Sequence, residues 1–235
     1  MLALKQSLSL PSIKTVGGYS PPSKASLVAW YQNKAMITLV APTPPAVIPN
    51  VSAWGDSSGN GHDMAQATAS EQPLYDISTG ALTFDGAKYQ SLQSLFSQIS
   101  LSGDFTIGLR IFPSASAAGT FLGDNTTGGE LFKYTNSTKI TIKIDASSGL
   151  GLDLDSGTFG DDYLIITRAS NVFALWQNGV EQTTTVTLAG TADIDAIGIR
   201  RTDMNAYYGA IKEIMIYDIS NATLTAEINT RLASL

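Results

Sequence analysis

The carboxylates of this chain are its most numerous candidates for general acid–base chemistry. The sequence has 20 acidic residues but a single histidine, His62, so it holds at most one imidazole base. Two aspartate pairs, Asp153 with Asp155 and Asp193 with Asp195, each share a strand face because their members stand two residues apart. No acidic motif accompanies either pair, so we interpret both as solvated strand faces. The expectation from the carboxylates is a protein that is not an enzyme.

Metal and nucleic-acid chemistry find little support in the composition. With 0 Cys and 1 His, the chain has no thiolate nucleophile, cysteine metal site or histidine cluster. The loop at 123–128 carries oxygen ligands of the kind that calcium prefers, but it reads equally well as an ordinary hairpin loop. We therefore assign no metal and no cofactor. A net charge of −6 without a Lys/Arg run also argues against a broad nucleic-acid-binding face.

Aromatic residues beside amides suggest a second kind of site. Sugar binding stacks an aromatic ring on the apolar face of a pyranose, next to polar acceptors. Trp176 and Gln177 offer this combination, and Tyr207 and Tyr208 add two rings just before an expected strand. These four residues are the candidate carbohydrate-binding residues. The alternative is that their rings pack in the core or in an interface.

The elements that must position these residues are mostly strands. Apolar residues alternate with polar ones over 105–111 and 139–145, the period of a half-buried strand. Asn178-Gly179 predicts a two-residue hairpin turn of type I′. Leu224, Ile228 and Leu232 predict one C-terminal helix, for which Thr225 is the expected N-cap. Many short strands with turn residues between them predict an all-β sandwich.

The first 24 residues differ from the rest and form an expected N-terminal arm and linker, ahead of a domain at 25–235. Gly17-Gly18 and Pro21-Pro22 punctuate the linker, and no secretory signal or membrane span is expected. The arm is either the first strand of its own sheet or an addition to a neighbouring chain's sheet edge. One face of the arm carries leucines at even positions, and these are the expected docking residues: Leu2, Leu4, Leu8 and Leu10.

Residues 54–86 carry a recognisable order of motifs, W-x-D-x-S-G-N-G-H-D, then P-x-Y, then F-D-G. Further matches are the hairpin around Asn178-Gly179, the strand at 209–218 and the closing L-T-A-E at 224–227. In these motifs the chain resembles the laminin-G-like branch of the concanavalin A-like lectin/glucanase superfamily, over roughly 27–235. The resemblance implies a jelly roll of two antiparallel sheets, one of them concave. It also implies a structural role for His62 and a buried, hydrogen-bonded Glu213.

That superfamily includes lectins, glycosidases, adhesins and virion parts, so the fold does not select a function. Its glucanase branch uses an E-x-D-x-x-E strand, and retaining hydrolysis needs carboxyls about 5–5.5 Å apart. No glutamate of this chain has an aspartate two residues later.

We therefore expect a non-enzymatic structural protein of a bacteriophage particle, either a head decoration or a tail appendage. Such a protein would be assembled in the host cytoplasm and located in the virion. Its expected partners are other capsid or tail proteins, reached through the arm, and further copies of itself. Host cell-surface glycans are a possible additional ligand. The alternative is a carbohydrate-binding or adhesin domain of a bacterial protein.

Overall fold

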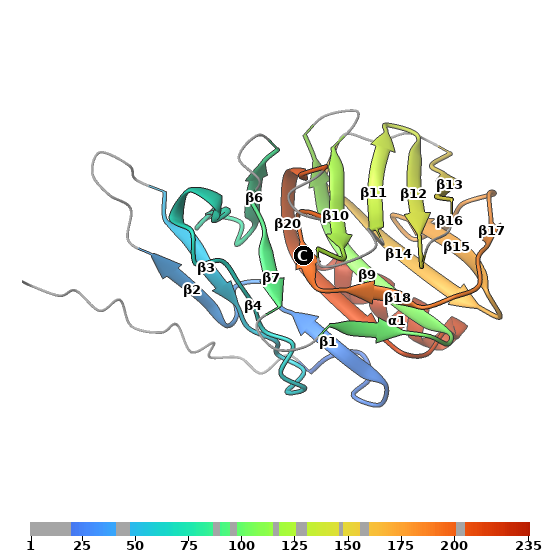
Figure 1. Cartoon of the computed structure of the whole chain (residues 1–235). Coiled ribbons are helices and arrows are strands. Elements are labelled where there is room, and N and C mark those ends of the chain that lie inside the picture. Colours follow the sequence, from blue (N-terminus) through green and yellow to red (C-terminus); the bar gives the residue numbers. More distant parts are fainter. Residues whose placement is uncertain are drawn as a thin grey trace, which may run out of the picture.

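The computed structural model describes residues 20–40, 48–86, 90–94, 98–114, 118–125, 131–145, 148–155, 160–200 and 205–235. The four leucines of the expected arm lie outside these residues. Within them the chain forms two layers of strands with one helix on the outside (Figure 1). Every strand pairing between described residues is antiparallel, and the expected sandwich with one C-terminal helix is confirmed.

One layer, the back sheet, is centred on two long neighbouring strands that pair along most of their length. On one side of this pair the sheet continues with β14 (Asp162–Ala169) and its hairpin partner β15 (Val172–Gln177). On the other side, short strands pair with the two halves of β20 (Tyr208–Tyr217): β1 (Leu27–Tyr31) with its C-terminal half and β6 (Leu82–Asp85) with its N-terminal half. Its members are β15 (Val172–Gln177), β14 (Asp162–Ala169), β9 (Phe105–Pro113), β20 (Tyr208–Tyr217), β1 (Leu27–Tyr31), β6 (Leu82–Asp85), β5 (Leu74–Tyr75), β16 (Val180–Glu181) and β17 (Val186–Thr187).

The other layer, the front sheet, joins the first because β3 pairs with β5. In pairing order its strands are β13 (Leu150–Asp153), β12 (Lys139–Lys143), β11 (Leu131–Asn136), β10 (Gly119–Gly123), β19 (Ala196–Ile197), β7 (Leu92–Ser94), β4 (Met64–Ala65), β3 (Asn50–Trp54) and β2 (Ile37–Val40). A separate pair is formed by β8 (Ile99–Leu101) and β18 (Ala192–Ile194), and a 3-10 turn spans Ala69–Glu71.

The main core lies between the two layers and follows the alternation of the sequence. On β9 the residues Phe105, Ile107, Leu109 and Ile111 are fully buried and pack against Ile140 and its neighbours from the front sheet. Because side chains alternate across a strand, the residues between them face the opposite side. Those residues lie under the helix, so both faces of the back sheet are covered there.

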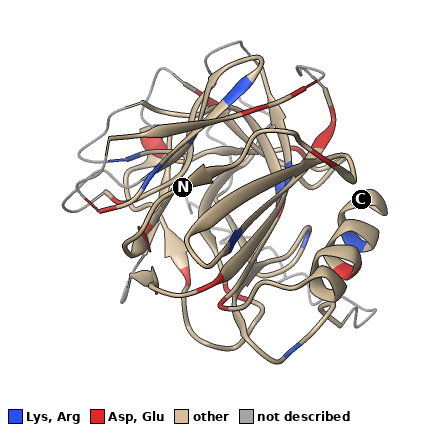
Figure 2. Ribbon diagram, turned by 90° about the vertical axis from the view of Figure 1, so that its right-hand side faces the viewer, with Lys and Arg blue, Asp and Glu red and all other residues tan. Residues whose placement is uncertain are grey.

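Helix α1 (Ala222–Ala233) packs on the outer face of the back sheet (Figure 2). Leu224, Ile228 and Leu232, the predicted stripe, form a second core with residues that include Ile165 of β14. A Cβ on Gly108 would lie 2.5 Å from Ile228, so a glycine is what lets the helix come this close.

The prediction of Thr225 as the N-cap of the helix is wrong, because the helix begins one turn earlier. Asn221, and not Thr225, is the N-cap, because the Asn221 side chain accepts a hydrogen bond from the backbone N–H of Leu224 at 2.9 Å. The Thr225 backbone N–H already donates to the Asn221 carbonyl and lies inside the helix. Asparagine is among the strongest N-cap residues.

A buried ion pair fixes this helix to the sheet. Glu213 of β20 is fully buried and accepts from Arg231 Nε at 2.8 Å and Nη2 at 2.7 Å. It also accepts from Trp30 Nε1 and from the Asn33 backbone N–H, each at 3.1 Å. One carboxylate therefore joins β1, β20 and α1. The expected structural role of Glu213 is confirmed.

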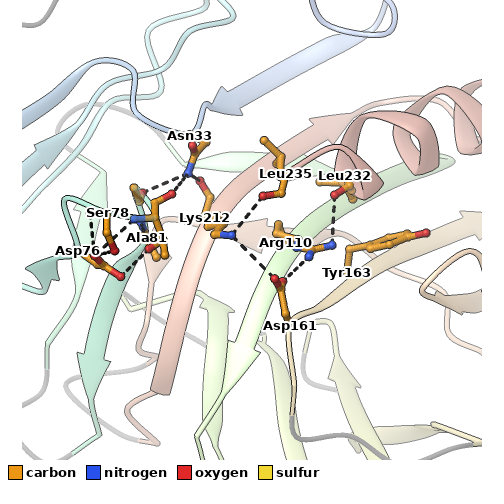
Figure 3. Close-up of polar contacts among 12 residues, drawn as sticks. Asn33, Asp76, Ser78, Ala81, Arg110, Asp161, Tyr163, Lys212, Leu232 and Leu235 are labelled. Carbon is orange, nitrogen blue, oxygen red and sulfur yellow. Dashed lines mark hydrogen bonds and ion pairs between the residues drawn. The ribbon is translucent and has the colours of Figure 1, made fainter.

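The C-terminal end of the helix is held by two cations of the back sheet (Figure 3). Arg110 donates to the Leu232 carbonyl at 3.3 Å, and Lys212 donates to the Leu235 carbonyl at 3.2 Å. Asp161 forms ion pairs with both cations. Positive side chains favour this end of a helix because its last carbonyls carry partial negative charge.

The first prediction concerns the ion pair. Arg231→Met leaves Glu213 as a buried carboxylate without its cation, which should lower the free energy of unfolding by about 3–5 kcal/mol. The control is the double variant Glu213→Gln with Arg231→Met, which removes the charge and keeps one acceptor oxygen, for the N–H of either Trp30 or Asn33. Urea denaturation followed by circular dichroism should show a smaller loss for the double variant. A single-variant loss below about 1 kcal/mol would contradict this role.

Candidate functional site

A groove of about 700 Å³ runs between helix α1 and the outer face of β14 and β15. It begins beside the helix N-terminus and ends at the hairpin turn at 178–179. Alternation along β15 produces its floor, because Phe173, Leu175 and Gln177 point into the core while the residues between them point outward. The lining contains small residues on both walls, Ala169 and Ala222 among them, which leave the space open.

Trp176 is the large aromatic side chain of the groove. It lies opposite Ile165 on one neighbouring strand and opposite Glu181 on the other. Its ring is half-buried, packing in part against the cluster under the helix. A ring held in this way keeps one orientation at little entropic cost, and it offers its remaining surface to the groove.

Polar side chains from both walls line the same groove as this ring. The Asn229 Oδ1 atom is buried and has no hydrogen-bond partner among the described residues. Across the hairpin, Glu181 supplies an exposed carboxylate, the one charged side chain among the described residues that line the groove. Threonines of β14, of the loop after β16 and of the helix add hydroxyl groups: Thr167, Thr185 and Thr225. The groove thus combines one aromatic ring with hydroxyl, amide and carboxylate groups.

The hairpin that closes the groove has the predicted form. Asn178 and Gly179 have φ values of 50° and 81°, the two positive angles of a type I′ turn. Asn178 also accepts from the Tyr163 backbone N–H at 3.0 Å and donates to Asp162 at 2.6 Å. These contacts tie the turn to the start of β14, so Trp176 and Glu181 keep a fixed relation to each other.

The structure does not bring the four candidate carbohydrate-binding residues together. Trp176 lies in the groove, but Gln177 points to the other side of its strand and is 4% exposed. Tyr207 is fully buried, with its ring 5.8 Å from that of Phe84. Tyr208 is exposed at the start of β20 and does not line the groove. Gln177 and Tyr207 therefore have almost no surface to offer a ligand.

Sequence reasoning missed Glu181 and Asn229 as companions of Trp176. Glu181 follows the predicted turn by two residues, so the hairpin register alone could have placed it beside the tryptophan. For Asn229 the sequence carries no such signal, because only the packing of the helix brings it to the hairpin.

The paired aspartates act as acceptors that hold loops. Asp153 accepts from Thr184 at 3.0 Å and forms an ion pair with Lys139 at 3.2 Å. The Thr184 hydroxyl and then Lys139 lower the pKa of the Asp153 carboxyl, the opposite of the shift that a catalytic acid needs. Asp155 accepts from Thr183, and Asp193 accepts from Ser100.

The described part of the chain has neither a metal-binding cluster nor a membrane-spanning helix. Its residues contain no group of three or more His, Asp or Glu side chains placed to hold a metal ion. Among those same residues, no helix has both the length and the apolar character needed to cross a bilayer.

Comparison with known proteins shows the fold and no closer relationship. No family model and no curated protein matches the sequence. Solved structures do match: a heptameric SAP-like pentraxin from Limulus polyphemus has a TM-score of 0.52 at 12% identity, covering 65% of this chain and 81% of its own. A GH54 α-L-arabinofuranosidase has a TM-score of 0.56 at 10% identity, covering 91% of this chain and 60% of its own.

A third similar structure is botulinum neurotoxin type C, with a TM-score of 0.51 at 11% identity. The match covers 89% of this chain but 51% of the neurotoxin chain, so this chain spans about half the length of that protein. These likenesses support the predicted lectin-like β-sandwich. They extend to fold alone, because identities of 10–12% leave the site residues free to differ.

The second prediction concerns the hairpin at the end of the groove. Gly179→Val places a branched side chain at positive φ and a Cβ 2.7 Å from Asn229 Oδ1, which should cost about 1–3 kcal/mol of stability from the strain alone. Gly103→Val is the matched control, since no atom lies within 4 Å of its Cβ position and its φ is not positive. Thermal unfolding should show a clear loss for the first variant only. Equal melting temperatures for the two variants would contradict the turn geometry.

Proposed function

We propose that the protein is a non-enzymatic, lectin-like domain that binds a neutral carbohydrate in the groove between α1 and β14–β15. The observation that carries this proposal is the half-buried Trp176 ring, which faces a groove bordered by Glu181, Asn229 and threonine hydroxyls. A pyranose has an apolar face for the ring and hydroxyls for the polar groups. Sites that bind small molecules combine a mostly apolar lining with a few polar groups in the same way.

The solved structures with this fold add support of a general kind. Cell entry of botulinum neurotoxin type C depends on two ganglioside molecules, and an arabinofuranosidase was solved with arabinofuranosyl-xylobiose. The arabinofuranosidase has a TM-score of 0.52 at 8% identity, and the match covers 51% of that chain. The neurotoxin and the arabinofuranosidase support carbohydrate as a ligand class for this sandwich. In this chain the groove is the proposed binding site.

The charge of the groove selects among carbohydrates. Among the lining residues that the structure describes, Glu181 is the one charged side chain, and it is negative. A sialic or uronic acid would bring a second carboxylate toward it without a Lys or Arg in the lining to pair with. Neutral sugars avoid this repulsion, and Glu181 can accept hydrogen bonds from their hydroxyls.

The absence of catalysis is part of the proposal. It is supported by the hydrogen bonds of Asp153, Asp155 and Asp193, each of which is engaged by a threonine or serine in a loop contact. Glu213, which is fully buried, is held by four donors and does not line the groove.

A second candidate function is a structural role in a bacteriophage particle, as a head decoration or tail appendage located in the virion. An exposed apolar surface around Ile48 and Ile77 favours it, because a protein that acts alone rarely leaves such a surface open. The leucine arm would then be the means of attachment to other virion proteins, and the groove would hold host glycans. Purified particles should contain the protein in many copies if this role is correct.

The third prediction tests the groove. Trp176→Ala should weaken binding of a neutral oligosaccharide, identified on a glycan array, by about tenfold or more, because ring stacking is lost. Tyr208→Ala is the control, as it removes an exposed ring outside the groove. Calorimetry should give an unchanged affinity for this control. A chain that binds no neutral glycan, or that loses binding through Tyr208 and not Trp176, would overturn the proposal.

The fourth prediction concerns the selectivity of the same groove. Glu181→Gln removes the negative charge but keeps an acceptor, so binding of neutral sugars should change little. Binding of their uronic-acid analogues should improve as the repulsion disappears, most clearly at low salt. A wild-type preference for the acidic analogue would contradict the electrostatic argument.

A further inference from the structure

A second surface of the molecule has the character of a docking site, on the outer side of β3, β5 and β6. Ile48 and Ile77 are 52% and 68% exposed and border a cavity of about 330 Å³ together with Leu74. The strand register places Val40, itself 40% exposed, in line with Leu74, and residues directly opposite each other share a sheet face. We call Val40, Ile48, Leu74 and Ile77 the apolar patch.

Among the described residues, the acidic rim of the apolar patch is a single residue, Asp76, and Lys34 lies near it with its Nζ donating to the Ser78 carbonyl at 3.3 Å. Asp76 and Ser78 line the same cavity as Ile77. Hydrogen bonds from the Ser78 and Thr79 hydroxyls lower the pKa of the Asp76 carboxyl to about 2, so it carries a negative charge at neutral pH (Figure 3). The surface therefore suits an apolar segment, and Asp76 offers one carboxylate to a cation beside it.

The first 19 residues of the chain have that chemistry. They contain Lys5 and Lys14 and no acidic residue, while the remaining residues hold 12 of the 14 basic and all 20 acidic residues, a net charge of −8. An extended segment would place Leu2, Leu4, Leu8 and Leu10 on one face and Lys5 on the other. Arm and patch are thus complementary in apolarity, and the positive charge of the arm is opposite to the net charge of the rest of the chain.

The length of the arm allows contact beyond its own domain. The described chain begins at Ser20, which lies beside Lys24 and Asn60 at a separate pocket. Nineteen residues in extended conformation reach about 60 Å. A compact body of this size has a radius of gyration of only about 17 Å, so the arm can cross to a neighbouring molecule.

We propose that residues 2–10 of one copy dock in extended form on the apolar patch of a second copy, with their leucines against Ile48, Leu74 and Ile77. The contact joins two different surfaces, the arm of one copy and the apolar patch of another. After one such contact forms, the first copy still has a free patch and the second copy still has a free arm. Contacts of this kind lead to rings or chains of subunits. The patch is then an interface for assembly, distinct from the groove under the helix.

Cysteine cross-linking tests this, because the chain has 0 Cys and every disulfide must be an engineered one. The full chain with Leu8→Cys is mixed under mild oxidation with the full chain carrying Ile77→Cys. The control partner carries Val180→Cys, an exposed residue (64%) on the hairpin by the groove. We expect about tenfold more cross-linked heterodimer with Ile77→Cys than with Val180→Cys, the factor for burial of one large apolar side chain. Equal yields would overturn the proposal.

The double variant Leu8→Cys with Ile77→Cys in one chain distinguishes a neighbour from the chain itself. Docking on a second copy gives a ladder of cross-linked dimers and larger species on a non-reducing gel. A monomer with an internal disulfide means that the arm covers its own patch, and this outcome would overturn the assembly contact.

The fifth prediction uses the same surface without cysteine. Ile77→Asp should reduce self-association about tenfold or more in sedimentation experiments, because it puts a charge at the centre of the patch and adds to the negative rim. Its melting temperature should stay close to that of the wild type, since the side chain is exposed. Lys5→Glu should weaken association too, and more at low salt than at high salt. If both variants, Ile77→Asp and Lys5→Glu, self-associate as strongly as the wild type, the proposal is contradicted.

Discussion

The buried carboxylate of Glu213 is the interaction on which the arrangement of this molecule depends. A carboxylate without water is stable only when its lone pairs are filled, and here four donors from a tryptophan, a backbone amide and an arginine fill them. These donors come from β1, from the turn after it and from α1. Satisfying one buried charge therefore sets where the helix lies on the sheet.

The groove is a consequence of that position. The helix approaches the sheet closely at Gly108, and the cations Arg110 and Lys212 hold its last turn. Near its first turn, alanines of the helix and the strands leave the space that Trp176 borders. A rigid floor and a rigid wall are what a binding site for a polar ring requires, because little entropy is lost on binding.

The fold itself selects no ligand. Structures of a pentraxin, a neurotoxin and an arabinofuranosidase share this sandwich at identities of 8–12%. The proposals for this chain therefore rest on its own side chains: the ring and polar groups of the groove for carbohydrate, and the exposed isoleucines beside Asp76 for a second copy. The two surfaces lie on different strands, so each can be altered without the other.

The sequence by itself determined the strands with clear alternation, the Asn178-Gly179 turn and the helix stripe. Those features depend on periods of two and four residues or on a single turn, which are local properties of a chain. Only the tertiary structure decided which face of β15 borders the groove, so that Trp176 lines it while Gln177 is buried, and that Tyr207 is core while its neighbour Tyr208 is exposed. It also decided that Asn229 meets the hairpin some 50 residues before it. Such meetings depend on long-range register and helix docking, and neighbouring residues in the sequence carry no record of them.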